Sequence, residues 1–384
     1  MIIKKVGAKI IHDSRGENTI RVFVKTQKGK FFASAPCGKS TSSFEASPYR
    51  TSIHHDVLFL NDLELPNIYS FDELWKIEKN TGKYIGANSL FALETALLRA
   101  LGYQNKKMLF EFLSDGKKIK KFPIPIGNAI GGGVHSSGKK PDFQEFWFIA
   151  KTKKFSTNVR LNHLGYLLVN KYLKSKTRND EGAWTTDKDN ESVISVMDCA
   201  KDYINKRYGN VIDIGIDCAA SSFYKNGFYV YKNKKQKLNK EKQIKYISYL
   251  AKKYNLHAIE DGLNENDFEG FRKLKQKNKN KLIIGDDLIA TNPERLLKAI
   301  KSKSINAVII KPNQIGSLLV VKKVIELAKK NHIKTIMSHR SGETNDFAIA
   351  DLAIAWQCDY IKAGIFGKER EAKLKRLIWI EKNN

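Results

Sequence analysis

Residues 211–364 contain six short apolar runs, and each of them ends at a charged residue. Three end in a carboxylate, two in a lysine and one in a His-Arg pair: 211–217 (VIDIGID), 256–260 (LHAIE), 282–286 (LIIGD), 305–311 (INAVIIK), 359–362 (DYIK) and 334–340 (KTIMSHR). The segments between them mostly have the length of one helix, which indicates alternating parallel strands and helices. When such units close into a barrel, the strand ends meet at one face, where chemistry gathers. The sequence therefore predicts one polar site assembled from distant residues.

The chain before these runs predicts a smaller domain. Residues 1–34 alternate apolar and polar positions between turn sequences, which favours a three-stranded β-meander over residues 2–11, 19–26 and 30–35. A helical pattern follows, clearest at residues 86–102 (GANSLFALETALLRALG), and it ends before the proline-containing link FPIPI at residues 122–126. The predicted fold class is α/β, with an N-terminal α+β domain over residues 1–121 and a C-terminal β/α barrel over residues 122–384.

Composition limits the cellular setting. The 384 residues are 42% hydrophobic, which is enough for globular cores, and the longest apolar runs fall short of the roughly 20 residues of a membrane span. Four scattered cysteines without a C-x-x-C pair indicate reduced thiols: Cys37, Cys199, Cys218 and Cys358. Lysines interrupt the apolar pattern of the first residues, so no signal peptide is expected. A cytoplasmic protein without a membrane partner is predicted.

The formal net charge of +28 is the unusual feature of the composition. Lysines are densest at residues 232–245 and 272–281. A nucleic-acid groove would interleave aromatic side chains with the basic ones, and these runs lack them. We interpret them as solvated faces of helices and turns, so a nucleic-acid partner is not expected. A positive field would still attract small anionic substrates.

The charged strand ends suggest a particular chemistry. Asp217, Glu260 and Asp286 have no His or Cys beside them, a set that suits Mg²⁺ better than Zn²⁺. A lysine beside a divalent cation has a lowered pKa and can act as a base. Arg340 and the following serine suit a phosphate group. Taken singly, each residue also has a structural explanation, such as a helix cap or a solvated charge, so the hypothesis depends on their recurrence at barrel spacing.

Motifs along nearly the whole chain resemble the enolase family, the phosphopyruvate hydratases. In order they are HDSRGENT (12–19), CGKST (37–41), FEA (44–46), GANSLFA (86–92), GNAIGGGVHSS (127–137), DFQEF (142–146), NDEGAW (179–184), GIDCAASSFY (215–224), IEDGL (259–263), GDDL (285–288), TNPERL (291–296), KPNQIGS (311–317), SHRSGET (338–344) and IKAG (361–364). The wording of DFQEF and NDEGAW is similar to archaeal members. The resemblance implies an enolase-type barrel and reversible dehydration of 2-phospho-D-glycerate to phosphoenolpyruvate.

The resemblance also implies a role for each matching residue. The tightly bound Mg²⁺ would be held by Asp217, Glu260 and Asp286, and a second Mg²⁺ would involve Ser40 of the 36–43 loop when that loop closes. The implied base for the C2 proton is Lys311, and the implied acid for the departing C3 hydroxyl is Glu181, with Glu145 close by. The remaining substrate-binding residues implied are His135, Gln144, His339, Arg340, Ser341 and Lys362. The family also implies a homodimer or a higher homo-oligomer.

The chain departs from the family pattern at a few positions, and two alternatives follow. Lys39 stands where a small residue usually precedes Ser40, and Ser42-Ser43 replace a glycine-containing pair, while Ser222 stands at a usual glutamate position. A lysine beside Ser40 can weaken the second Mg²⁺ or replace part of its charge. One alternative is a paralogue acting on a different carboxylate, which the phosphate-directed Arg340-Ser341 pair disfavours. The other is a protein that keeps the fold and binds RNA or an anionic surface through its positive charge.

Overall fold

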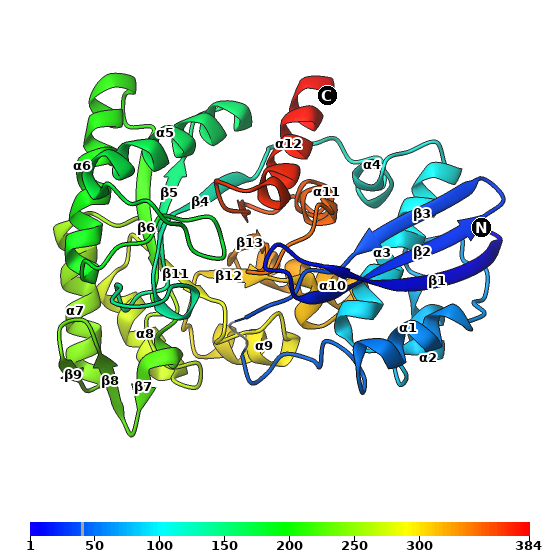
Figure 1. The fold of residues 1–384 in the computed structure, drawn as a ribbon, viewed down its shortest axis with the longest axis horizontal. Coiled ribbons are helices and arrows are strands. Elements are labelled where there is room, and N and C mark those ends of the chain that lie inside the picture. Colours follow the sequence, from blue (N-terminus) through cyan, green and yellow to red (C-terminus); the bar gives the residue numbers. More distant parts are fainter. Residues whose placement is uncertain (40–41) are drawn as a thin grey trace.

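The computed structural model describes residues 1–39 and 42–384 and begins with a three-stranded antiparallel sheet in the order β1-β2-β3 (Figure 1). The strands are β1 (Ile3–His12), β2 (Asn18–Thr26) and β3 (Gly29–Ser34). Side chains alternate along β2, so Ile20, Val22 and Val24 are buried on one face. This arrangement confirms the predicted meander.

Four helices complete the first part of the chain: α1 (Ile53–Asn61), α2 (Leu74–Thr81), α3 (Ala87–Gln104) and α4 (Leu109–Leu113). Helix α3 packs on β2 and β3 and is buried around most of its circumference, because its sequence is apolar on nearly every face. Its first turn is fixed by the buried Asp56, whose Oδ2 accepts hydrogen bonds from the Gly86 amide at 2.8 Å and from Ser89 Oγ at 2.6 Å.

Eight strands then close into a barrel in the order β10-β11-β12-β13-β14-β4-β5-β6. They are β4 (Ile124–Gly131), β5 (Glu145–Ala150), β6 (Ile212–Asp217), β10 (Ala258–Glu260), β11 (Leu282–Gly285), β12 (Ala307–Ile310), β13 (Lys334–Ser338) and β14 (Tyr360–Lys362). Strand β5 is antiparallel to both of its neighbours, β4 and β6, whereas the other pairs are parallel. Side chains such as Trp147, Ile284 and Ile309 fill the interior, so the barrel is a packed core.

Helices cover the outside of the barrel and explain the lysine-rich sequence. They are α5 (Phe155–Leu173), α6 (Asn190–Tyr208), α7 (Lys240–Lys253), α8 (Phe268–Lys277), α9 (Pro293–Lys301), α10 (Leu318–Lys330), α11 (Ala348–Ala355) and α12 (Lys368–Asn383). Between β6 and α7 the chain forms a small separate sheet of β7 (Tyr224–Lys225), β8 (Phe228–Tyr231) and β9 (Gln236–Leu238). The basic runs lie on this sheet, on α7 and on α8, whose apolar faces are buried and whose lysines mostly face outward.

The first part of the chain reaches the barrel through a turn and a loop. The Ser14 amide, in the β1–β2 turn, donates to the Glu343 carbonyl at 2.8 Å. Cys37 and Gly342 exchange two backbone hydrogen bonds, at 2.7 and 2.8 Å, so the loop after β3 pairs with the loop after β13. The boundary near residue 121 stays a prediction. In the described part of the chain, no helix is both long and apolar enough to cross a membrane.

Candidate active site

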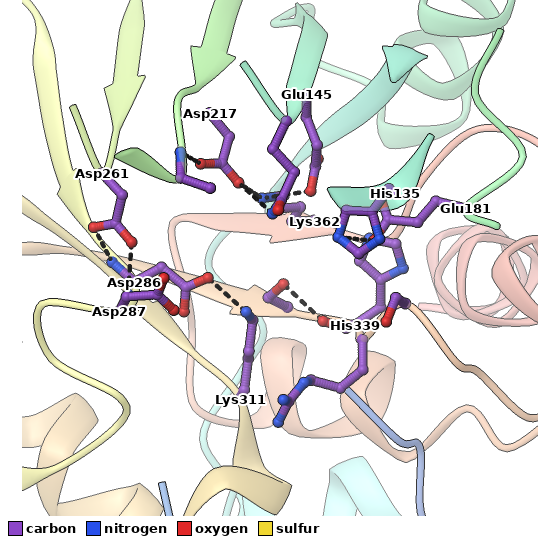
Figure 2. A pocket seen from close by; sticks show the side chains of 15 residues that line it. His135, Glu145, Glu181, Asp217, Asp261, Asp286, Asp287, Lys311, His339 and Lys362 are labelled. Atoms are coloured by element: carbon purple, nitrogen blue, oxygen red, sulfur yellow. Dashed lines mark hydrogen bonds and ion pairs between the residues drawn. The ribbon is translucent and has the colours of Figure 1, made fainter. Parts of the chain in front are cut away.

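A polar cavity opens at the carboxyl ends of the parallel barrel strands (Figure 2). It brings together nearly all of the residues singled out from the sequence: His135, Gln144, Glu145, Glu181, Asp217, Asp286, Lys311, His339, Arg340, Ser341 and Lys362. Glu260 does not line the cavity, because it is completely buried beside Asp217 and Lys362. The predicted Ser40 lies outside the described residues.

Strand register explains why these side chains meet. Asp217 at the end of β6 is paired with Glu260 at the end of β10 on one side and with Glu145 on the other. Glu145 is the first residue of β5, but β5 runs antiparallel, so its beginning lies at the same barrel end as the ends of its neighbours. The direction of one strand therefore places an additional carboxylate in the site.

Lys362 is the central cation of the carboxylate group. Its Nζ lies 2.9 Å from Glu260, 3.2 Å from Glu145 and 3.3 Å from Asp217, and the side chain is 4% exposed. Burial alone lowers the pKa of Lys362, but the surrounding carboxylates outweigh it and raise that pKa well above its ordinary value. Lys362 is thus a permanent positive charge at the base of the cavity.

Lys311 approaches from the opposite side of the cavity, at the end of β12 (Figure 2). Its Nζ lies 2.5 Å from Asp286 Oδ2, and its amide donates to Thr291 Oγ1 at 2.9 Å. Burial is the largest single influence and lowers the pKa of Lys311, but the Asp286 and Asp287 carboxylates together outweigh it and the net direction is upward. The lowered pKa expected beside Mg²⁺ stays a prediction for the metal-bound protein.

Two further acids in the cavity, Asp261 and Asp287, were missed by the sequence analysis. Asp261, Asp286 and Asp287 could offer three oxygens within 4.8 Å of one another to a metal ion. Asp261, however, already accepts the amides of Asp286 and Asp287, at 3.1 and 2.6 Å. Burial and the charge of Asp286 raise the pKa of Asp287 to about 8. The available signal was the doubled acids in IEDGL and GDDL.

Unpartnered oxygens distinguish the two candidate ligand sets. Within the described residues, Glu260 Oε2 and Asp286 Oδ1 are buried and accept no hydrogen bond. Buried carboxylate oxygens normally have a partner, so these two fit a cation ligand better than the occupied oxygens of Asp261 do. Glu260 and Asp286 therefore each offer an open oxygen that fits a Mg²⁺ ion. Both oxygens of Asp217 accept hydrogen bonds, from the Ala219 amide at 2.9 Å and from Lys362 Nζ at 3.3 Å, so Asp217 as the third ligand stays a prediction.

Glu181 and His135 form the other wall of the cavity. Glu181 Oε2 accepts a hydrogen bond from Asn128 Nδ2 at 3.0 Å, and Oε1 lies 3.8 Å from His135 Nε2. Burial raises the pKa of Glu181, but the surrounding basic groups, first His135 and then His339, Arg370 and Lys362, together outweigh it, so the net direction is downward. Burial and the neighbouring Glu181 raise the pKa of Glu145 to about 7. Glu145 therefore has the higher pKa of the two carboxyl groups.

The loop after β13 presents a serine and an arginine to the cavity. Ser341 Oγ accepts two hydrogen bonds, from Arg15 Nη1 at 3.3 Å and from the Lys39 amide at 2.9 Å, which leaves its own proton available to an anion. Arg340 pairs with Glu45 at 2.9 Å. From the sequence Arg15 had no assigned role beyond its place in the HDSRGENT motif, and its contact with Ser341 depends on the docking of the β1–β2 turn.

Lys39 contacts the loop that carries Glu181. Its Nζ lies 3.1 Å from Asp180 Oδ2, and its side chain is 46% exposed. Asp180 also lies 3.0 Å from His135 Nδ1. The ammonium of Lys39 thus has a carboxylate partner across the cavity mouth.

Comparison with known proteins gives one consistent result. Residues 119–384 match the family described as "Enolase, C-terminal TIM barrel domain". A protein named enolase from Picrophilus torridus is 35% identical over 99% of this chain and 98% of its own length. The enolase from Archaeoglobus fulgidus is 36% identical over 99% of this chain and 97% of its own. The enolase from Sulfurisphaera tokodaii is also 36% identical, over 99% and 95%.

Proposed function

Because the chain belongs to the enolase family, we propose that it catalyses the reversible dehydration of 2-phospho-D-glycerate to phosphoenolpyruvate and water. The observation that carries the proposal is the convergence of Lys311, Glu181 and the Arg340-Ser341 pair on one cavity. This set can bind a phosphate, remove a proton and return one to a leaving hydroxyl.

In this proposal the substrate is held at both ends. Arg340 and the Ser341 hydroxyl would bind the phosphate, with the geometry that a planar guanidinium offers to such oxygens. The Lys362 ammonium would lie against the substrate carboxylate. His339, Gln144 and His135 would complete the wall, and burial lowers the pKa of His339 well below its ordinary value, so that it is a neutral contact.

Lys311 would remove the C2 proton. That proton is very weakly acidic, because its removal places more negative charge on a group that already carries a carboxylate. Lys362 offsets this charge from a fixed position, which is the most effective arrangement because no reorganisation is needed during the reaction. Mg²⁺ held by Asp217, Glu260 and Asp286, and a second Mg²⁺ that involves Ser40, would add positive charge at the substrate oxygens.

Glu181 would protonate the departing C3 hydroxyl. Both oxygens of Glu145 are engaged, by Trp147 Nε1 at 2.7 Å and by Lys362 at 3.2 Å, whereas Glu181 Oε1 is more open. An acid must carry its proton, and the cations around Glu181 oppose this in the free protein. The negative charge of a bound phosphorylated substrate would raise the pKa of Glu181 and load it with a proton.

The direct test is turnover of 2-phospho-D-glycerate at saturating Mg²⁺, followed by the ultraviolet absorbance of phosphoenolpyruvate. Absence of turnover by the wild-type protein would overturn the proposal. Turnover of a different carboxylate in its place would identify the paralogue that the sequence left open.

The two candidate metal sets make different predictions for Mg²⁺ binding. We expect Glu260→Gln to weaken Mg²⁺ binding about 10-fold or more. That is the loss usually seen when a residue that hydrogen-bonds to a metal ligand is removed, and removal of a ligand itself should cost at least as much. Asp287→Asn should change it by less than about threefold, because Asp287 is not a ligand in the proposed set. Calorimetric titration with Mg²⁺ measures both. A larger loss in Asp287→Asn than in Glu260→Gln would favour the Asp261, Asp286 and Asp287 set.

Removal of Lys39 should have a smaller effect on the Mg²⁺ requirement. Because its ammonium is half exposed and paired with Asp180, removing it should change the Mg²⁺ concentration for half-maximal rate by less than about threefold, the size of a surface ion pair. Initial rates against Mg²⁺ concentration for Lys39→Ala measure this, with the exposed Lys139→Ala as the matched control. A tenfold lower Mg²⁺ requirement in Lys39→Ala alone would mean that Lys39 obstructs the second metal.

The remaining predictions rest on the family. A phosphorylated small molecule as ligand, homo-oligomeric assembly and a cytoplasmic location stay predictions, and the size-exclusion profile of the purified protein would test the second of them.

A further inference from the structure

Arg370 of α12 connects two loops of the proposed active site, although it does not itself line the cavity. It is 2% exposed, and its Nη2 donates to the Ser341 carbonyl at 2.7 Å and to the Asp180 carbonyl at 3.2 Å. Ser341 belongs to the loop after β13, and Asp180 directly precedes Glu181. One guanidinium nitrogen therefore joins the loop that would hold the phosphate to the loop that would carry the acid.

Close packing fixes Arg370 in this position. Gly364 has a positive φ of 72°, and a Cβ added there would lie 2.7 Å from Arg370 Cδ. Gly182, on the loop of the acid, has φ of 79°, and a Cβ there would lie 2.5 Å from the Phe366 carbonyl oxygen. The turn before α12 thus contacts both the stem of Arg370 and the loop of Glu181, and side chains larger than glycine would separate them.

The surroundings of Arg370 are poorly suited to a purely stabilising role. Its Nε is buried without a hydrogen-bond partner in the described part of the chain. Lys373, three residues later on the same helix, has a carboxylate partner, Glu343, at 2.6 Å. An arginine buried on carbonyl groups carries a desolvation cost that an apolar side chain of the same size would avoid.

We propose that Arg370 is a positioning residue, which holds Glu181 at the distance from Arg340 and Ser341 that a phosphate-bound substrate requires. The inference rests on the proposed function. As the C3–O bond breaks, its electron pair leaves with the oxygen, and the pair left at C2 forms the C2–C3 double bond. The oxygen takes the Glu181 proton and departs as water. Arg370 exchanges no proton in this step.

The two loops differ in how strongly they are held without Arg370. The loop of Ser341 is also fixed by the paired backbones of Cys37 and Gly342 and by the Glu343 carboxylate, which accepts the Arg340 amide at 3.1 Å. The backbone of the Glu181 turn is held from within by Asn179, whose Oδ1 accepts the amides of Glu181 and Ala183, and from α5 by Tyr166, whose Oη donates to the Gly182 carbonyl at 2.8 Å. The Ser341 carbonyl also accepts Ser14 Oγ at 3.5 Å, whereas the donor to the Asp180 carbonyl, next to the acid, is Arg370. Loss of Arg370 should therefore displace the acid more than the phosphate-binding pair.

Lys311 offers an internal reference, because it directly follows β12 and Arg370 donates no hydrogen bond to it. Removal of the C2 proton can be followed alone, as exchange of that hydrogen with deuterium from D₂O by NMR. Formation of phosphoenolpyruvate follows the whole reaction. A displaced acid lowers the rate of phosphoenolpyruvate formation and leaves the rate of C2 exchange unchanged.

The experiment compares Arg370→Met and Arg370→Lys with the wild type. A misplacement of about 1 Å costs about 100-fold in rate, so kcat for dehydration should fall about 100-fold in Arg370→Met. KM and the rate of C2 exchange should remain close to those of the wild type, and Arg370→Lys should recover part of the loss. Arg376→Met is the matched control, because Arg376 lies on the same helix and pairs with Asp351 at 2.8 Å, away from the site.

Each outcome has a distinct meaning. Dehydration and exchange lost together, or neither lost, would overturn the positioning role, and so would an equal loss in Arg376→Met. If Arg370→Met fails to fold, Arg370→Lys carries the test, because it keeps the charge and alters the geometry. A wild-type protein that neither exchanges nor dehydrates 2-phospho-D-glycerate would refute the proposed function itself.

Discussion

Replacing Lys311 with alanine should reduce the rate of phosphoenolpyruvate formation by about 10⁴-fold, the upper end of what one general base contributes. Lys311 directly follows β12 and lines the cavity, and its side chain is partly buried, at 13% exposure. Thr291 fixes its backbone, since Thr291 Oγ1 accepts the Lys311 amide and donates to Gln314 Oε1 at 2.6 Å.

The measurement for Lys311→Ala is the rate of dehydration together with the rate of C2 hydrogen exchange. Both should fall, because both need the proton at C2 to be removed. Lys334→Ala is the matched control: Lys334 stands at the start of β13, and its exposed side chain pairs with Asp359 at 3.1 Å. Exchange that continues at the wild-type rate in Lys311→Ala would assign the base to another residue.

Replacing Glu181 with glutamine should separate the two rates. Dehydration should fall about 10³-fold, within the range for loss of a general acid, while C2 exchange should remain close to that of the wild type. Glutamine keeps the size of the side chain and can still contact Asn128, but it has no acidic proton to give to the C3 oxygen. The predicted effect of Arg370→Met is a weaker form of the same pattern.

Glu145→Gln is the necessary comparison, because Glu145 has the higher pKa, about 7, and so holds a proton more readily near neutral pH. In our proposal Glu145 contacts Lys362 and raises the pKa of that lysine. Loss of the Glu145 carboxylate should therefore impair C2 exchange and dehydration alike. Selective loss of dehydration in Glu145→Gln, with Glu181→Gln retaining it, would reverse the assignment of the acid.

The fold was predictable because its signals are local. Alternating side chains indicated β1 to β3, and apolar runs that end in charges indicated β6 and the five strands from β10 to β14. Residues at strand ends share one barrel face whatever the details of packing, so Asp217, Asp286, Lys311 and Lys362 could be grouped from their spacing. The antiparallel β5 was not predicted, since a short buried run carries no mark of its direction.

Other features of the site depend on geometry that spacing does not encode. Asp261 follows Glu260 directly, but its positive φ of 41° redirects the chain, and its carboxylate binds two amides of the next loop. Glu260 was predicted as part of the site and lies just beneath the cavity surface. These positions follow from how the loops fold over the barrel end.

The sequence by itself determined which acids, lysines and arginine stand at the ends of the strands, and which family the chain resembles. Only the tertiary structure decided the partners of those charges. It places Lys39 on Asp180, Lys362 among three carboxylates and Arg370 between two loops. The reason is physical, because burial and charge act over distances in space, and the groups that set a pKa here are more than a hundred residues apart in the chain.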